Sequence, residues 1–321
     1  MNVKLLTLLI FFCFGLNTYA QIEGVKVRFV HNADNSCDFF YEKSNPGTYH
    51  LIIKFESIKN TPKYFYEGNI KENSGFLFKL MPIKPEKKIK FICEPYYIKG
   101  NPKPDIDKNF TYLLPFKKGK NISIWSIMTI ASALTEGDNY YGGYINFTES
   151  SQNQTIHAMR KGIVIEIENE YDFDPKSFDI YYEKRNFIII EHEDGTYAKY
   201  AGFKKDAIKV NIGQTILPTD YLGFLEKSVD NQYHLFFDIY YKAYMKDVFP
   251  DKTKDLDKRI IKKLNPFFQT NKGLIALDDK IYESQNYIVT TPEEIICKEL
   301  TKKELEAKTK ILNNVHEKLS N

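Results

Sequence analysis

The chain has 321 residues, of which 43% are hydrophobic, 27% charged and 15% aromatic. This length and apolar content allow one large domain or two smaller ones with a real core, which excludes a wholly disordered protein. The 45 basic residues nearly balance the 42 acidic ones, so the formal charge is +3. So small an excess does not indicate binding to nucleic acid or to an acidic membrane surface.

The segment 1–20 has the pattern of a secretory signal. Lys4 supplies a positive start, a nearly continuous apolar run follows over 5–16, and the small residue Ala20 ends the segment. A run of about 12 residues is too short to cross a bilayer, which needs about 20. The sequence therefore predicts export to the periplasm or the medium after cleavage near Ala20, with no transmembrane segment.

Three cysteines remain after this cleavage, namely Cys37, Cys93 and Cys297. An oxidising compartment would permit a disulfide between Cys37 and Cys93, and three unpaired buried thiols are the equal alternative. The spacings fit no zinc ribbon or zinc finger.

Residues 21–117 are expected to form an N-terminal β-sandwich-like domain. Short runs of β-forming residues alternate with turn residues there. The predicted strands are Val25–Val30, Tyr49–Phe55, Gly75–Met81 and Lys90–Glu94.

Residues 118–289 are also rich in strand signals, and residues 290–321 are expected to form a helical tail. In the first of these regions, Asp194-Gly195 predicts a hairpin turn, because glycine adopts the positive φ that such a turn requires. In the tail, Thr291 to Glu294 and Thr301 to Glu304 have the pattern of capping boxes. The predicted fold class is therefore mainly β with C-terminal helices.

An ordered series of segments in the middle region resembles the lysostaphin/LytM-type zinc endopeptidases, which cut peptide cross-links in bacterial peptidoglycan. The resemblance covers roughly 110–241 and implies their antiparallel β core, the duplicated hybrid motif fold. The segments that carry it are Met159–Val164, Ile189–Ala201, Val210–Gln214, Asp220–Gly223 and His234–Asp238.

The resemblance also implies a zinc site, but this sequence departs from it at the ligand positions. In the family, an early His, an Asp and the second His of a His-x-His bind zinc, which activates a water molecule. The segment 134–140 contains no histidine, the Asp position is Asn146, and the second His of the pair is replaced by Phe236. The helper His after Tyr-Ala is Gly202, so only the assisting His234 remains.

We therefore expect no metal, no other cofactor and no confident catalytic residue. Tyr200, His234 and Asn146 are candidates for the substrate groove of the resembling family. The remaining histidines, His157 and His192, are expected at the surface or at strand ends, hydrogen-bonded to neighbours, rather than at a new zinc site.

The sequence leaves three hypotheses for function. The first is an exported, non-catalytic peptidase-like protein that binds peptidoglycan or regulates a cell-wall hydrolase. The second is an active peptidoglycan metalloendopeptidase with an atypical zinc site. The third is a structural or adhesion protein that works through its N-terminal sandwich.

Overall fold

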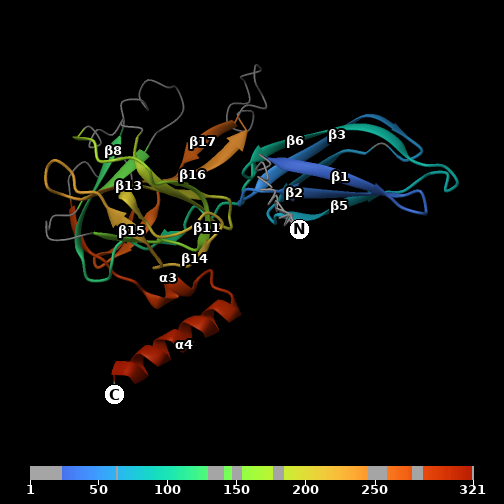
Figure 1. Ribbon diagram of the computed structural model, residues 1–321. Helices are drawn as coiled ribbons and strands as arrows, with labels where there is room; N and C mark the ends of the chain where they lie inside the picture. The colour runs from blue at the N-terminus through green and yellow to red at the C-terminus, as the bar shows by residue number, and fades with distance from the viewer. Residues whose placement is uncertain are drawn as a thin grey trace, which may run out of the picture.

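The computed structural model describes residues 24–62, 64–128, 141–146, 154–175, 184–244, 259–276 and 285–319. The predicted signal segment 1–20 and the segment 134–140 lie outside the described residues. The fold is mainly β, as predicted, with two helices at the C-terminal end. In Figure 1 a small sandwich projects from one side of a larger β body, and the two helices lie along another side of that body. Among the described residues, no helix is both long and apolar enough to cross a membrane.

The N-terminal sandwich consists of two three-stranded antiparallel sheets. One sheet has the order β1 (Val25–His31), β2 (Cys37–Lys43) and β5 (Ser74–Leu80). The other has the order β4 (Tyr66–Ile70), β3 (Tyr49–Lys59) and β6 (Lys90–Lys99). The sandwich was predicted, although β2 and β4 were not.

Aromatic side chains hold these two sheets together. The Phe39 ring on β2 stacks on Phe78 with centroids 4.5 Å apart and meets Phe91 of the opposite sheet at 5.2 Å. Such aromatic pairs add to the free energy gained by burying the rings. Cys37 lies in the same core and Cys93 packs against it, both as free thiols, and burial raises the pKa of each.

The larger body is built on an eleven-stranded sheet. Its main path runs β14-β11-β12-β13-β16-β9-β8-β20; β15 joins β10 to β13, and β17 pairs with β16. A separate small sheet has the order β19-β18-β7. The strands are β7 (Thr111–Tyr112), β8 (Asn121–Met128), β9 (Tyr141–Asn146), β10 (Thr155–His157), β11 (Gly162–Glu168), β12 (Asn186–Glu191), β13 (Tyr197–Ile208), β14 (Thr215–Ile216), β15 (Tyr221–Leu225), β16 (His234–Tyr244), β17 (Arg259–Lys263), β18 (Phe267–Thr270), β19 (Gly273–Ala276) and β20 (Gln285–Ile288).

The strands β12, β13 and β16 present two different faces, because successive side chains of a strand point to opposite sides. One face contributes Ala198, Tyr200 and Phe237 to the main core. We call the opposite side the outer face, made up of Phe187, Ile189, Glu191, Tyr197, Lys199, Ala201, Phe236, Asp238 and Tyr240. The main core fixes the register of the three strands and therefore also fixes which side chains share the outer face.

This arrangement corrects the prediction for Tyr200. Its side chain is fully buried in the main core, and its hydroxyl accepts a hydrogen bond from the backbone N–H of Met159 at 2.9 Å. A residue on the core face cannot contact a ligand in a groove on the outer face. Tyr200 is a packing residue.

The leading segment Phe110–Phe116 also belongs to the larger body. Phe110, Tyr112, Leu114 and Phe116 are buried in its core, and β7 pairs with β18. The predicted boundary at residue 117 assigned this segment to the N-terminal domain, whereas the resemblance, which covers roughly 110–241, already included it. The alternating apolar residues of this segment need a core to bury them, and the core within reach is that of the larger body.

The helical tail consists of α3 (Glu293–Cys297) and α4 (Lys302–Leu319). At the start of α4 the predicted capping box forms: the Glu304 carboxylate accepts from the Thr301 N–H at 2.7 Å, and Thr301 Oγ1 accepts from the Glu304 N–H at 3.3 Å. At α3 the prediction fails, because Pro292 is the N-cap and makes no side-chain cap bond.

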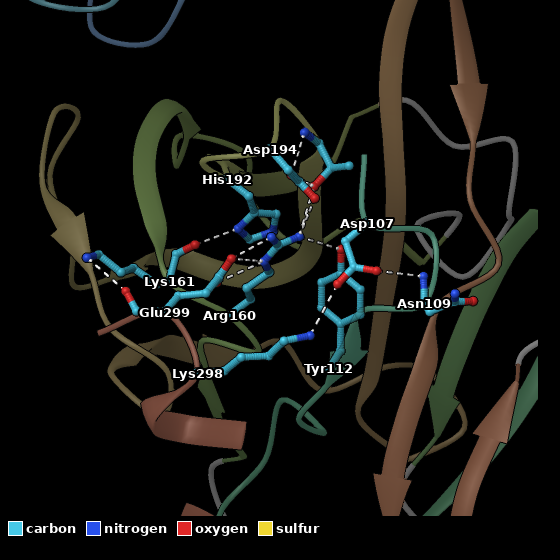
Figure 2. Close-up of polar contacts among 10 residues, drawn as sticks. Asp107, Asn109, Tyr112, Arg160, Lys161, His192, Asp194, Lys298 and Glu299 are labelled. Carbon is cyan, nitrogen blue, oxygen red and sulfur yellow. Dashed lines mark hydrogen bonds and ion pairs between the residues drawn. The ribbon is translucent and has the colours of Figure 1, made fainter. Parts of the chain in front are cut away.

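A buried arginine fastens this tail to the larger body (Figure 2). The Arg160 side chain is 2% exposed; it pairs with Glu299 of the tail at 2.5 Å and with Asp194 of the hairpin at 2.9 Å. Its guanidinium also lies 3.6 Å from the centroid of Phe110. Three separate segments of the chain therefore meet at one cation.

Candidate functional site

The structure brings four predicted positions, His234, Asn146, Phe236 and Gly202, close together, whereas Tyr200 lies on the core face. On β16, His234 lies directly opposite Asn146 of β9, and Phe236 lies opposite Ala201 of β13. Gly202 follows Ala201, at the point where β13 leaves β16. These four positions therefore lie close together on three neighbouring strands.

Gly202 leaves no room for a histidine at the helper position. Its φ is +107°, a conformation that side-chain-bearing residues rarely adopt. A Cβ atom built there would lie 2.5 Å from the carbonyl oxygen of His234. Both the backbone conformation and the packing at this position require glycine.

The Arg185 guanidinium covers Phe236, the residue at the predicted metal-ligand position. The guanidinium carbon of Arg185 lies 3.9 Å from the ring centroid of Phe236, a favourable cation–π geometry. A phenyl ring offers no lone pair to zinc, and a fixed positive charge beside it repels a second cation. Among the described residues, no group of three His, Cys, Asp or Glu side chains could hold a metal ion. These residues do not fit the zinc of the resembling family.

His234 is buried in this site and bonded to a carboxylate. Its side chain is 3% exposed, and its Nε2 atom donates to Asp230 Oδ2 at 2.9 Å. Burial lowers the pKa of His234, although Asp230 opposes that shift. The histidine is therefore neutral near pH 7, and Asp230 orients its ring.

A small cleft lies beside these residues, between two loop segments. Its volume is about 40 Å³, enough for one or two water-sized groups, and Arg185, Gly202, His234 and Phe236 are among its lining residues. Asn186 fixes one wall, because its side chain donates to the Tyr171 carbonyl and accepts from the Tyr171 N–H, both at 2.9 Å.

Charged side chains continue from this cleft along the outer face. The Lys199 ammonium lies 4.3 Å from the ring centroid of Phe187, and Lys263 pairs with Asp238. Phe187 and Phe236 flank the small residue Ala201 as its partners on the two neighbouring strands. Burial lowers the pKa of Lys199, with Asp238 and Glu166 opposing the shift and Lys263 and Arg185 adding to it.

The N-terminal sandwich contacts the other end of the outer face. The Thr48 backbone N–H donates to Glu191 Oε2 at 2.8 Å. A Cβ atom built on Gly100 would lie 2.6 Å from the Tyr197 hydroxyl, so the backbone approaches closely there. As a result Ile189, Tyr197 and Tyr240 form a separate buried cluster at that end.

The two remaining histidines of the larger body differ from each other. His157 is half-buried and bonded to Thr219 O and Thr155 Oγ1, as predicted for a strand-end histidine. His192 directly follows the end of β12, is 2% exposed and donates from Nδ1 to the Lys161 carbonyl at 2.7 Å, so it is a buried strand-end histidine rather than a surface one. Burial first, and then Arg160, lower the pKa of His192 to about 3.

Arg185, Lys199 and the Arg160 network were not predicted as functional or structural residues. Arg185 and Lys199 have no motif around them, and their importance depends on rings that are distant in sequence. One signal was available in the sequence. Only four of the 45 basic residues are arginine, so each arginine marks a position where lysine, the common basic residue of this chain, is not used.

The fold and the converging positions define a peptidase-like β domain, and the family comparison agrees. Residues 144–248 match the model of peptidase family M23. This part of the chain is therefore an M23 domain, of the lysostaphin/LytM type. No protein with a curated description matches the chain.

Several solved structures are similar over part of the chain. The SpoIIQ–SpoIIIAH pore-forming complex matches with 16% identity and a TM-score of 0.30, over 41% of this chain and 85% of that one. The M23 metalloprotease pseudoalterin, from the deep sea, matches with 12% identity and a TM-score of 0.32, over 56% and 99%. Csd3 of Helicobacter pylori matches with 12% identity and a TM-score of 0.28, over 74% and 77%.

Proposed function

We propose that this protein is an exported, non-catalytic M23-family protein that binds peptidoglycan or regulates a cell-wall hydrolase. The observation that carries the proposal is the Arg185 guanidinium on Phe236, which puts an organic cation and a phenyl ring at the predicted metal-ligand position. The close packing of Gly202 against the His234 backbone supports it further, because this backbone cannot accept the family's helper histidine.

Export and the wall ligand are part of the proposal and rest on the sequence. The apolar run that follows Lys4 supports export, and the resemblance to wall-cutting enzymes supports peptidoglycan as the ligand. The site retains a buried, oriented His234 and an adjoining cleft, which fit a surface that holds a ligand without cutting it.

The test combines metal analysis, hydrolysis and binding. The purified chain starting at Gln21 is analysed for zinc, incubated with peptidoglycan sacculi, and sedimented with them after chelation. We expect no stoichiometric zinc, no released muropeptides and co-sedimentation with the sacculi. Zinc together with muropeptide release that is lost in His234→Ala would instead establish the active endopeptidase of the second hypothesis.

A partial restoration of the metal site provides the control. Phe236→His returns one nitrogen ligand, but Asn146 and Gly202 are unchanged, so we expect neither zinc binding nor hydrolysis. Muropeptide release by this single variant would contradict the proposal, since it would mean that the other ligands are already present.

A further inference from the structure

The far end of the N-terminal sandwich carries a group of exposed lysines. Strand β3 runs from Tyr49, beside the larger body, to Lys59, and its 11 residues span about 33 Å. The loops next to Lys59 therefore lie at the end of the sandwich that points away from the body (Figure 1). We call the exposed lysines there and their two exposed apolar neighbours the sandwich tip, made up of Lys59, Met81, Ile83, Lys84, Lys87, Lys88 and Lys90.

Asn60 holds the two loops of the sandwich tip together. Its side chain donates to the carbonyl oxygens of Lys84 and Lys87, at 3.0 and 2.7 Å, and accepts from the Lys84 N–H at 2.8 Å. Its backbone carbonyl accepts from the Ile83 N–H, also at 2.8 Å. The residues of the tip therefore form one surface whose backbone is fixed by hydrogen bonds.

The charge of the tip is not neutralised by the protein. None of its five lysines forms an ion pair with a carboxylate of the residues that the structure describes, whereas Lys79 pairs with Asp38 nearby. Lys59 and Lys90 are direct cross-strand partners, a position in which like charges destabilise a sheet.

The segments 31–36, 56–65 and 81–90, which make up this end of the sandwich, contain six lysines against three carboxylates. Their net charge of +3 equals the formal charge of the whole chain. The nearly balanced composition of the chain therefore conceals a local excess of positive charge, which an anionic surface would offset.

Two apolar side chains protrude among these lysines. Ile83 is 64% exposed and Met81 is 56% exposed, whereas Ile89 of the same loop is 2% exposed in the sandwich core. Ile89 thus anchors the loop, and the other two side chains remain outside the core. Pro82 and Pro85 restrict the backbone on either side of Ile83. A fixed loop that presents apolar side chains to solvent suits a partner that buries them.

We propose that the sandwich tip docks on the surface of an anionic lipid bilayer. Lysines attract the anionic headgroups, and apolar side chains beside them enter the boundary between headgroups and acyl chains. The exposed Ile83 favours a lipid surface over an anionic polysaccharide, which offers no hydrocarbon layer to bury it. This inference goes beyond the proposed function, because the cleft at His234 belongs to the larger body and remains available to another ligand.

Flotation of the chain starting at Gln21 with lipid vesicles tests the proposal. One set of vesicles is phosphatidylcholine alone, and the other contains equal parts of phosphatidylcholine and phosphatidylglycerol. The tip variants are Lys87→Gln/Lys88→Gln, which removes two adjacent charges, and Ile83→Ser, which removes the most exposed apolar side chain. Thermal melting verifies that each variant is folded.

The larger body provides matched controls for both variants. Lys117→Gln/Lys118→Gln removes another adjacent pair of exposed lysines. Ile212→Ser removes an isoleucine that is 54% exposed. These controls change the charge and the apolar surface of the protein by the same amounts as the tip variants do, but at a distance from the tip.

We expect the wild type to float with the anionic vesicles, to stay behind with phosphatidylcholine alone, and to be released by high salt. A lysine near an anionic surface contributes about fivefold to affinity, so Lys87→Gln/Lys88→Gln should weaken binding at least tenfold. Ile83→Ser should weaken it at least threefold, and each control less than twofold. The proposal is overturned if the wild type does not float with anionic vesicles, or if the tip variants and the controls bind equally.

The outcome is separable from that of the proposed function, because sacculi and vesicles are tested apart. If vesicles float the protein but sacculi never sediment it, the tip proposal stands and peptidoglycan is rejected as the ligand. If vesicles never float it and Lys87→Gln/Lys88→Gln alone weakens sedimentation with sacculi, the tip binds an anionic polymer of the wall and the lipid proposal is rejected.

Discussion

At the scale of single residues, the site contains two residues that are incompatible with the zinc chemistry of the family, beside the histidine that is retained, His234. Gly202 and Phe236 occupy positions where a histidine would otherwise contribute, and each is held by its surroundings. Gly202 packs against the His234 backbone, and Phe236 carries the Arg185 guanidinium. Replacing either residue with histidine would therefore require the neighbouring structure to shift.

The packing at Gly202 leads to a prediction about stability. Gly202→Ala combines a positive φ with a Cβ atom 2.5 Å from the His234 carbonyl oxygen, so we expect a loss of about 3 kcal/mol or more in unfolding free energy. Gly119→Ala is the control, because Gly119 has a φ of +85° but nothing within 4 Å of the added atom. It should cost about 1 kcal/mol. Equal losses in urea unfolding would show that packing at Gly202 is unimportant.

The buried His192 predicts a loss of stability in acid. Its pKa is about 3 in the folded chain, against about 6.5 in the unfolded chain. Between these values the unfolded chain binds a proton that the folded chain does not, so stability falls as pH decreases through this window. The expected loss from pH 7 to pH 5 is about 2 kcal/mol for this group.

Urea unfolding of the wild type and His192→Phe at several pH values between 7 and 5 measures this contribution. The variant should have a distinctly shallower pH dependence, and the remaining slope includes His234, whose pKa burial also lowers. His31→Phe, at an exposed position, should retain the wild-type slope. The same slope in His192→Phe would mean that this imidazole does not control acid stability.

The site was only partly predictable from the sequence. The positions of His234, Asn146, Gly202 and Phe236 follow from the order of short motifs, and strand register does bring them together. Arg185 was out of reach because its partner ring lies 51 positions later in the sequence. Tyr200 was misplaced because the motif identifies its strand without saying which face of the strand meets the core.

At the scale of secondary-structure elements, Arg160 links segments that no local pattern connects. It contacts Tyr112 before β8, Asp194 in the β12–β13 hairpin and Glu299 between α3 and α4. Lys161 forms an ion pair with Glu304 at 2.7 Å. Arg160 therefore binds the segment before α4, and its neighbour Lys161 binds the first turn of α4. The tail is thus docked through charge, in a region where its apolar residues are few.

Removal of Arg160 should release this docking. Arg160→Met leaves the carboxylates of Asp194 and Glu299 partly buried without their cation, for an expected cost of about 3–5 kcal/mol in unfolding free energy. The control is Arg28→Met, which removes an exposed pair with Glu42 and should cost at most about 1 kcal/mol. If chemical unfolding finds the two variants equally stable, the Arg160 network does not hold the tail.

The elements themselves were predicted where an apolar run was uninterrupted. The strand β3 and the hairpin at Gly195 were predicted correctly, and Gly195 has the expected positive φ of 84°. The strand β2 was missed because Asp38, Glu42 and Lys43 flank its three consecutive aromatic residues, of which Phe39 and Tyr41 are buried in the core. The small sheet pairs β7, which precedes the eleven-stranded sheet in the chain, with β18, which follows most of it, and no local pattern reveals such a pairing.

At the scale of the whole molecule, the sandwich and the larger body meet at Glu191. This buried carboxylate accepts from the Thr48 N–H and from the Tyr197 hydroxyl, whereas Glu193 nearby pairs with Lys71 at the surface. A cavity of about 610 Å³ lies between the sandwich, the body and the tail next to this contact. Polar bonds therefore contribute to the junction beside the close packing of Gly47 and Gly100 against the larger body.

Loss of the Glu191 carboxylate should loosen the sandwich. In Glu191→Ala the Thr48 N–H and the Tyr197 hydroxyl lose their acceptor, at a cost of about 1–3 kcal/mol for each polar group left buried. We expect faster proteolysis of the connecting segment 100–109 and a larger radius of gyration in X-ray scattering. Glu193→Ala removes only the exposed pair with Lys71 and should leave both quantities unchanged. A compact, protease-resistant Glu191→Ala protein would indicate that other contacts hold the junction.

The docking of the sandwich at Glu191 limits how far the outer face is open along β13. Ala201 and Tyr197 are four positions apart on this strand, about 13 Å at the usual rise of a strand. The backbone of Gly100 lies close to the Tyr197 hydroxyl. An extended molecule that entered beside Gly202 and followed β13 would therefore meet the sandwich within about 13 Å.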